Sequence, residues 1–235
     1  MPMLEIRDLD VYYGEFQALT SIALDVEKSQ IVSLMGANSA GKSTLLKTIS
    51  GILRPGSGGI SFEGKSIDGL EPHEIVSMGI ALVPQGRKIF SNLTVRENLL
   101  VGSYTPRARK TRDKTLANVL ELFPALKGRI QQRGTDLSGG EQQMLAISRA
   151  LMSQPHFIIF DEISLGLSPI VVKELYKTIK RMNQEGMTVV VVEQDVKRSV
   201  RVSDFAYILL EGKITLRGDP KGFTEEMVKK AYFGL

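Results

Sequence analysis

The sequence predicts an α/β fold in which a core of parallel strands and helices has an antiparallel β flank at its N-terminal side and an inserted helical subdomain. Short apolar runs without alternation, typical of strands buried on both faces, predict the core. Apolar and polar residues alternate near the N-terminus, which predicts the flank. Strand patterns are absent between about residues 90 and 153, where helical spacing predicts the inserted subdomain. All 235 residues are expected to form one domain.

The antiparallel flank begins near residue 4. Apolar positions alternate with polar ones from residue 4 to residue 26, which places Leu4, Ile6 and Ile22 on one face. Residues 60–62 continue the pattern after a turn rich in proline and glycine.

Solid apolar runs predict four buried core strands, at residues 31–35, 80–83, 157–160 and 189–192. Each run is strand-sized and is flanked by a helix-like segment, as in a parallel sheet. Residues 205–216 carry Glu-Gly-Lys between two apolar runs, which predicts a β-hairpin after the core.

Helical patterns dominate the inserted subdomain. Thr94 and Glu97 have the spacing of a capping box, which predicts a helix start. An apolar stripe with helical spacing follows over residues 116–123, and residues 140–152 predict another helix. Beyond the subdomain, a helix is expected from residue 169 to the glycine at 186.

A phosphate-binding loop connects the first core strand to the helix-like run at residues 45–52. Its residues read Gly-Ala-Asn-Ser-Ala-Gly-Lys-Ser-Thr, the pattern G-x-x-x-x-G-K-[ST]. The glycines let backbone N–H groups surround the phosphates, Lys42 supplies a charge, and the Ser43 hydroxyl can ligate Mg²⁺. The loop therefore predicts binding of a nucleoside triphosphate. The residues expected to contact it are Gly36, Ala37, Asn38, Ser39, Ala40, Gly41, Lys42, Ser43 and Thr44.

Two carboxylates, Asp161 and Glu162, follow the buried run at residues 157–160. They fall at the carboxyl end of a central strand, where α/β sheets gather ligands. Alone, the pair is equally consistent with a solvated acidic turn, but the upstream phosphate loop favours a catalytic role. Asp161 is then expected to hold Mg²⁺ through water, and Glu162 to orient and activate the attacking water as a base beside Lys42.

Residues 137–143 read Leu-Ser-Gly-Gly-Glu-Gln-Gln, which resembles the signature of the ATP-binding cassette (ABC) ATPases, a class of P-loop NTPases. Serine and two glycines at a helix N-terminus expose N–H groups to an anion. The resemblance implies that two such domains pair head to tail, with ATP between the phosphate loop of one and the signature of the other. The signature residues expected at the partner's ATP are Leu137, Ser138, Gly139, Gly140 and Glu141.

The same resemblance implies roles for further residues. Tyr13 matches the aromatic that stacks on adenine, and Gln85 matches the Q-loop glutamine that senses Mg²⁺ and the transporter partner. Residues 164–167 match the D-loop, which touches the opposite subunit. Gln194 occupies the position of the switch histidine in most ABC ATPases. It can position the γ-phosphate and water but cannot act as an acid or base, which leaves the base role to Glu162.

The resemblance covers essentially the whole chain and is greatest to the shorter, F type of branched-chain amino-acid transport ATP-binding proteins, on residues 82–99, 142–151, 192–195 and 231–235. It implies an Mg²⁺-dependent ATPase that drives import of a small polar solute, with a branched-chain amino acid as the first expectation. The implied partners are a second ABC ATPase subunit (identical or a longer paralogue), transmembrane permease subunits and, indirectly, a solute-binding protein. The chain would be peripheral, on the cytoplasmic side of the cell membrane. The alternatives are a urea/amide-type importer and, with less support, a soluble ABC ATPase without a transport role.

Two positions depart from the family pattern. Ser39 stands where glycine is usual; if the backbone there needs a positive φ, serine costs about 1 kcal/mol and weakens nucleotide affinity. Ile163 replaces the proline that usually follows the acidic pair, which is expected to loosen the turn without removing a reactive group.

Composition limits the other functions. The absence of cysteine excludes disulfides and thiolate metal sites. The net charge of +4 is small, and the basic stretch at residues 107–114 is expected to be a solvated helix face, so no nucleic-acid partner is predicted. A secretion signal and a membrane-spanning segment are not expected either.

Overall fold

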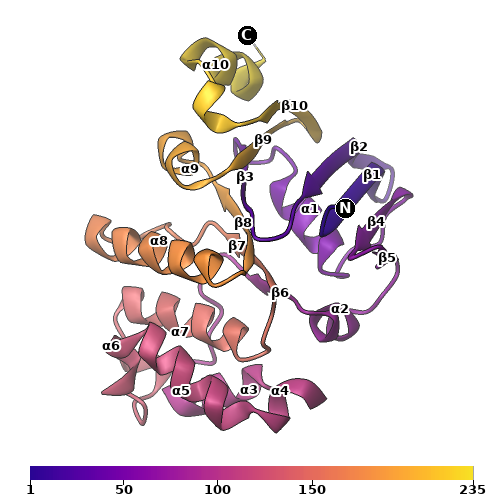
Figure 1. Ribbon diagram of the computed structural model, residues 1–235. Coiled ribbons are helices and arrows are strands. Elements are labelled where there is room, and N and C mark those ends of the chain that lie inside the picture. The colour runs from indigo at the N-terminus through magenta and orange to yellow at the C-terminus, as the bar shows by residue number, and fades with distance from the viewer. Residues whose placement is uncertain (235) are drawn as a thin grey trace.

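Two β-sheets and a group of helices make up the structure, a computed structural model that describes residues 1–234. Leu235, the last residue of the C-terminal Ala-Tyr-Phe-Gly-Leu segment, lies outside the described residues. A four-stranded sheet stands beside a central six-stranded sheet. Helices α3 to α7 gather at the end of the molecule opposite to the C-terminus (Figure 1).

The four-stranded sheet is antiparallel throughout and has the order β2-β1-β4-β5. Its strands are β1 (Leu4–Tyr13), β2 (Phe16–Val26), β4 (Ser57–Phe62) and β5 (Lys65–Ser66). Leu4 and Ile6 are fully buried on the core face of β1, and Leu9 and Val11 resume that face after a register shift between Ile6 and Leu9. Leu4 pairs with Val26 on one side and with Phe62 on the other. The predicted antiparallel flank is therefore confirmed.

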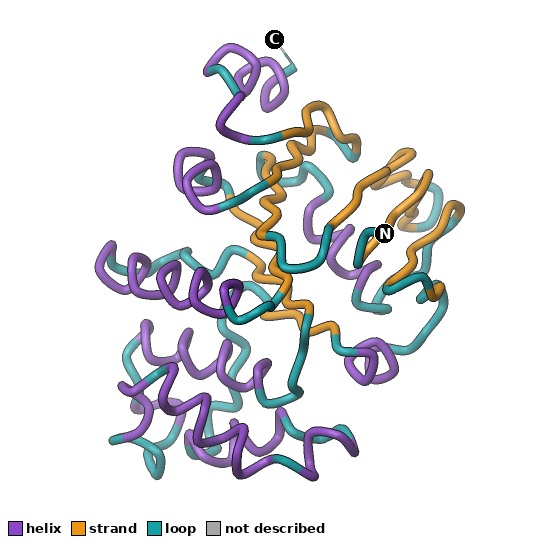
Figure 2. Tube along the Cα trace, viewed as in Figure 1, coloured by secondary structure: helices purple, strands orange, loops and turns teal. Residues whose placement is uncertain are grey.

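The central sheet has the order β10-β9-β3-β8-β7-β6, and all neighbours except β9 and β10 run parallel. Its strands are β3 (Ile31–Gly36), β6 (Ile80–Val83), β7 (Phe157–Asp161), β8 (Thr188–Glu193), β9 (Phe205–Leu210) and β10 (Lys213–Gly218). The four predicted core strands are confirmed. The predicted hairpin is β9 and β10, but it is also part of the core, because β9 pairs with β3. Figure 2 shows these strands running through the middle of the molecule.

Helices cover both faces of the central sheet and form the inserted region between β6 and β7 (Figure 1). Outside that region the helices are α1 (Lys42–Ile49), α2 (Pro72–Met78), α8 (Pro169–Gln184), α9 (Val196–Val202), α10 (Glu225–Phe233) and the 3-10 turn η2 (Pro220–Gly222). The inserted region contains α3 (Val95–Gly102), α4 (Pro106–Lys110), α5 (Arg112–Leu122), α6 (Pro124–Lys127), the 3-10 turn η1 (Gly134–Asp136) and α7 (Gly139–Leu151).

Local signals place several helix ends correctly. Thr94 caps α3, since its hydroxyl accepts from the Glu97 N–H at 3.2 Å and the Glu97 carboxylate accepts from the Thr94 N–H at 2.8 Å. Gly186 follows α8 with a φ of 98°, a left-handed conformation that suits glycine. Helix α1 begins at Lys42, three residues before the apolar run suggested, because its first turn belongs to the phosphate loop.

Two hydrophobic cores lie on the two faces of the central sheet. Phe157 and Ile159 of β7 pack with the antiparallel sheet and α1, whereas Ile158 and Phe160 pack with α7 and α8. All four side chains are fully buried. A strand buried on both faces needs apolar residues at every position, which explains the unbroken runs. The two cores fix the carboxyl ends of the strands, where the site lies.

The surface of α4 and α5 carries the basic stretch of residues 107–114. Its arginine and lysine side chains are all exposed, as predicted for a solvated helix face. Arg107 donates to the backbone carbonyl of Gln154 at 2.7 Å, so one of these cations supports the fold. Within residues 1–234, no helix has both the length and the apolar character needed to cross a membrane.

Candidate nucleotide site

The phosphate loop runs from the end of β3 to the start of α1. Gly41 precedes α1 with a φ of 105° and provides no side-chain cap, so the first N–H groups of the helix face the loop. A Cβ at Gly41 would lie 2.7 Å from Leu19, and one at Gly36 only 2.5 Å from the Leu209 carbonyl oxygen. The local packing therefore requires glycine at both ends of the loop.

Ser39 has a φ of 67°, in the left-handed region. The positive φ on which the expected cost of serine depends is present, and serine carries strain of about 1 kcal/mol here. Its side chain is exposed, so packing gives no separate reason for serine.

Lys42 is only 5% exposed, and its ammonium group is turned back onto its own loop. The Nζ atom donates to the carbonyl oxygens of Gly36 at 2.7 Å and of Ala37 at 2.9 Å. It also lies 3.6 Å from Oε1 of Glu162. Lys42 therefore links the phosphate loop to the predicted base.

The Glu162 carboxylate is 9% exposed and lies at the centre of the site. Gln85 donates through Nε2 to Oε2 at 2.8 Å. Gln194 donates through Nε2 to both carboxylate oxygens, at 2.9 and 2.8 Å. The structure thus brings together Lys42, Gln85, Glu162 and Gln194, which come from four separate parts of the sequence. Gln194 is a donor to the carboxylate here, a contact that differs from the γ-phosphate and water it was predicted to position.

The turn after the acidic pair is anchored by its backbone. Glu162 has a φ of 47°, and its N–H donates to the Val192 carbonyl oxygen at 2.9 Å. Ile163 is 1% exposed and packs in the core that contains α8. The apolar side chain at 163 therefore anchors the turn by burial, where a proline would restrict it through its ring.

The three predicted metal contacts are Ser43 in the first turn of α1, Gln85 just after β6 and Asp161 at the end of β7. Burial and the neighbouring Glu162 charge raise the pKa of Asp161, although the Gln85 backbone and Lys42 act in the opposite direction. A cation would offset that cost. Ser43, Gln85 and Asp161 offer hydroxyl, amide and carboxylate oxygens, the donors that Mg²⁺ prefers. No group of three or more His, Cys, Asp or Glu residues within residues 1–234 could hold a metal ion.

A cavity of about 550 Å³ lies over the phosphate loop and is lined by both aromatic and polar side chains. Tyr13 is half-exposed in its wall, and its hydroxyl lies 3.5 Å from the Thr44 hydroxyl. Phe16 also lines the cavity and is 70% exposed, a residue that the sequence analysis missed. Tyr13 and Phe16 pair across a tight turn, so the available signal was an aromatic on each side of Gly14.

The signature residues do not line this cavity. Ser138 caps α7 instead: its hydroxyl accepts from the Glu141 N–H at 3.4 Å, and Glu141 accepts from the Ser138 N–H at 2.8 Å. Glu141 also pairs with Arg129 at 2.6 Å. The sequence analysis missed this capping box, although Ser-x-x-Glu is its signal. Within one chain, the signature residues therefore lie apart from the phosphate loop and its cavity.

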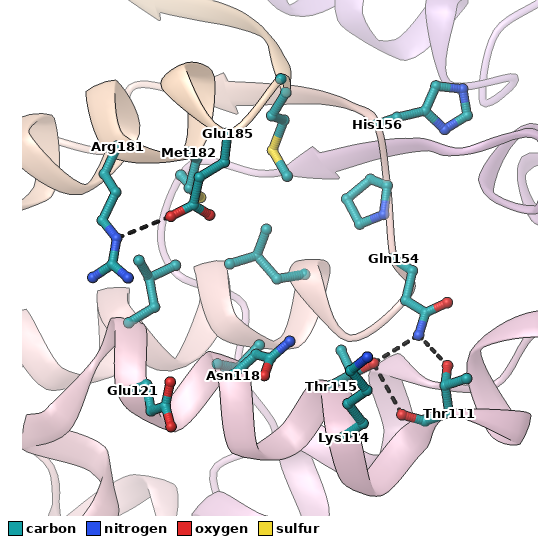
Figure 3. A pocket seen from close by; sticks show the side chains of 16 residues that line it. Thr111, Lys114, Thr115, Asn118, Glu121, Gln154, His156, Arg181, Met182 and Glu185 are labelled. Atoms are coloured by element: carbon teal, nitrogen blue, oxygen red, sulfur yellow. Dashed lines mark hydrogen bonds and ion pairs between the residues drawn. The ribbon is translucent and has the colours of Figure 1, made fainter.

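A further hollow of about 620 Å³ lies between α5 and the end of α8 (Figure 3). Gln154 points toward α5 and donates to the hydroxyls of Thr111 and Thr115. Arg181 and Glu185 form an ion pair at 3.1 Å on the other side. No predicted site residue lines this hollow, so it is separate from the nucleotide cavity.

Comparison with known proteins agrees with this geometry. The sequence profile of the ABC transporter family matches residues 19–164. The high-affinity branched-chain amino acid transport ATP-binding protein BraG of Pseudomonas aeruginosa is 44% identical, over 99% of this chain and 100% of that protein. The probable branched-chain amino acid transport ATP-binding protein LivF of Archaeoglobus fulgidus is 35% identical, over 99% of both chains.

A solved structure shows the same fold. The dimeric structure of a bacterial ABC transporter cassette superposes with a TM-score of 0.80 and 26% identity, over 94% of this chain and 100% of that one. The match includes both the antiparallel and the parallel sheet, because it covers nearly the whole chain. The chain belongs to the ABC transporter family, as one of its ATP-binding cassettes.

Proposed function

We propose that this chain hydrolyses ATP as the nucleotide-binding subunit of an importer for branched-chain amino acids. The observation that carries the proposal is the convergence on Glu162, whose carboxylate meets Gln85 at 2.8 Å, Gln194 at 2.8 Å and Lys42 at 3.6 Å. A carboxylate that is fixed by amide donors beside a phosphate-binding lysine suits a general base for attack by water.

The roles of the residues follow from their positions. The N–H groups of the loop and the first turn of α1 bind the phosphates, and the Lys42 ammonium exchanges its loop carbonyls for phosphate oxygens. Tyr13, with Phe16 beside it, offers an aromatic surface to the adenine. Glu162 accepts a proton from the attacking water as the water oxygen bonds to the γ-phosphorus and the bond to ADP breaks. Gln194 keeps the carboxylate oriented during this step.

A magnesium ion fits the oxygen donors of Ser43, Gln85 and Asp161. When bound, Mg²⁺ neutralises charge on the phosphates and orients them. The chain's own contribution is to place a hydroxyl in the first turn of α1, an amide just after β6 and a carboxylate at the end of β7.

A second cassette completes the proposed site. The signature residues 137–141 lie away from the phosphate loop of their own chain, so they are available to the ATP of a partner. The dimer seen for the related bacterial cassette supports this arrangement. The partner is either a second copy of this chain or a longer paralogue.

A groove beside the site supports docking of a permease. It has a volume of about 570 Å³ and is lined by Gln85 and the residues after it, together with α7. Gln143, at its wall, is buried, and its Nε2 has no hydrogen-bond partner in the described part of the chain. A carbonyl or carboxylate from a permease segment would satisfy this donor. Docking there places the chain peripherally, on the cytoplasmic side of the membrane.

The substrate proposal rests on the two relatives whose names specify branched-chain amino acids, at 44% and 35% identity over nearly the whole chain. A solute-binding protein and the permeases would select the solute. The purified complex with both should hydrolyse ATP faster when the binding protein carries leucine than when leucine is absent. Stimulation by urea alone would overturn the substrate, and copurification with ribosomes or nucleic acid in place of permeases would overturn the transport role.

The hydrolytic role is tested by Glu162→Gln. The variant keeps the size of the side chain but removes the proton acceptor, so turnover should fall by about 10²-fold or more while ATP still binds. An ATP-bound dimer should accumulate, measured by analytical ultracentrifugation, while phosphate release measures turnover. Glu174→Gln, at an exposed position on α8, is the matched control and should behave as the parent. Parental turnover in Glu162→Gln would refute the base assignment.

A further inference from the structure

A group of four polar side chains lies near the predicted base, and three of them, Glu193, Tyr176 and Arg198, have no role above; the fourth, Ser164, is the first residue of the segment that matches the D-loop. Glu193, at the end of β8, accepts through Oε1 from the Tyr176 hydroxyl at 2.8 Å and through Oε2 from the Ser164 hydroxyl at 2.9 Å. The Ser164 oxygen in turn accepts from Nη1 of Arg198 at 2.7 Å. The Arg198 guanidinium lies 5.8 Å from the centre of the Tyr176 ring. These four residues are called the Glu193 network below.

Glu193 and Tyr176 are the buried members of the network, and at Glu193 the fold alone would accept an apolar residue. Glu193 is 3% exposed and follows four consecutive valines in β8. Burial raises the pKa of Glu193, and it also raises that of Tyr176. A buried carboxyl group opposes folding unless its hydrogen bonds compensate, and an apolar side chain is often as stable at such a position. The carboxyl group at 193 therefore calls for a role other than packing.

The network joins two chain segments that both enter the site. Glu193 directly precedes Gln194, and Ser164 lies two residues after Glu162. The Glu162 N–H donates to Val192, so the two segments run side by side. Gln194 bonds to Glu162, which lines the nucleotide cavity, and Glu193 bonds to Ser164, which does not line it. The segments are thus tied at two points.

The hydrogen bond between Ser164 and Glu193 matters because Glu162 has a strained backbone conformation. Its φ of 47° is rare for a residue with a side chain, and such a conformation persists only where its surroundings hold it. Ser164 donates to Glu193 of β8 and accepts from Arg198 of α9, which limits the movement of the turn that carries Glu162.

We propose that Glu193 is a positioning residue for ATP hydrolysis: through Ser164 and Tyr176 it fixes the Glu162 turn against the strand that carries Gln194. This inference rests on the proposed function, since it concerns the same hydrolytic step. It acts on the base and leaves the phosphate loop untouched. Loss of the network should therefore lower kcat and leave KM and Kd for ATP nearly unchanged.

The test uses two variants that reach Glu193 from opposite sides. Ser164→Ala removes the hydroxyl between Glu193 and Arg198, and Tyr176→Phe removes the donor from α8. We expect kcat to fall about 10-fold in Ser164→Ala and at least threefold in Tyr176→Phe, with KM and Kd for ATP within twofold of the parent. Ser164→Thr keeps the hydroxyl and should restore kcat. Ser77→Ala is the matched control, because it removes an exposed hydroxyl from α2 that bonds only to His73.

Tyr176→Phe separates the network from a direct contact of Ser164 with a partner subunit, because Tyr176 is buried within its own chain. Parental kcat in Tyr176→Phe would overturn the proposal, as would equal changes in kcat and KM, or failure of Ser164→Thr to restore activity. If the parent chain itself fails to hydrolyse ATP with its permeases present, the proposed function fails. If the parent is active and both variants match it, only the role of Glu193 fails.

Discussion

Replacing Lys42 with methionine tests whether the buried ammonium holds the phosphate loop before any nucleotide arrives. Methionine keeps the length of the stem, so the substitution removes the donors without opening a large cavity. The lost contacts are the hydrogen bonds to Gly36 and Ala37, at 2.7 and 2.9 Å, and the ion pair to Glu162 at 3.6 Å.

The expected loss of stability follows from these contacts. A hydrogen bond from a charged group contributes about 1.5–3 kcal/mol, so two bonds contribute roughly 3–6 kcal/mol. Relief from burying the ammonium offsets part of this sum, because a buried charge itself opposes folding. The variant also leaves the Glu162 carboxylate without its cation. We expect the unfolding free energy of the nucleotide-free chain to fall by about 2–4 kcal/mol, which lowers Tm by about 5–15 °C for a chain of this size.

Thermal and urea unfolding of Lys42→Met, without and with ATP, measure both parts of the effect. Lys47→Met is the control, since Lys47 is exposed on the same helix and its loss should change stability by about 0.5 kcal/mol or less. Saturating ATP should stabilise the parent by about 4 kcal/mol at 1,000 times Kd, and Lys42→Met much less. An unchanged Tm for nucleotide-free Lys42→Met would refute the reasoning, because the bonds of Lys42 to its own loop would then contribute nothing.

Two further predictions concern Ser39 and Glu193. Ser39 has a φ of 67°, a conformation that costs serine about 1 kcal/mol more than glycine. Ser39→Gly should tighten Kd for ATP by about fivefold in titrations, because about 1 kcal/mol of strain is removed, and an unchanged Kd would contradict the expected loss of affinity. Burial raises the pKa of Glu193, although its neighbours Tyr176, Ser164 and Arg198 act in the opposite direction, so the folded chain binds a proton there more readily than the unfolded chain. Its stability contribution therefore declines as pH rises above the ordinary value of 4.5. The unfolding free energy of Glu193→Gln relative to the parent, measured in urea, should rise over this range by at most about 1.4 kcal/mol per pH unit, and a difference independent of pH would contradict the assignment.

The elements that sequence patterns identify are those whose cause is local. The β7 run is apolar at every position because both faces of the strand are buried, and the cap of Thr94 and Glu97 involves residues three apart. The hairpin of β9 and β10 was also predicted from local signals. Its parallel pairing with β3 was not, because partners such as Val32 and Phe205 lie far apart in the sequence.

The same distinction explains what was found at the site. The loop pattern identifies its own glycines and raises the question of φ at Ser39, which the structure answers. It does not reveal that Lys42 bonds to its own loop, or that Gln85 and Gln194 both reach Glu162. Those contacts depend on which strand ends are neighbours, and strand order is a property of the whole sheet.

The strand order makes Glu162 the common point of the site. In the order β3-β8-β7-β6, Glu162 follows β7, and its carboxylate meets Lys42 from the loop after β3, Gln194 from the end of β8 and Gln85 from the end of β6. Gln85 and Glu162 line both the nucleotide cavity and the groove proposed for the permease. Under the proposed function, nucleotide binding would act on Glu162 through Lys42, and a permease docked in the groove would act on it through Gln85. Each signal would then cross a single side chain, so the proposed coupling between transport and hydrolysis requires no long pathway through the core.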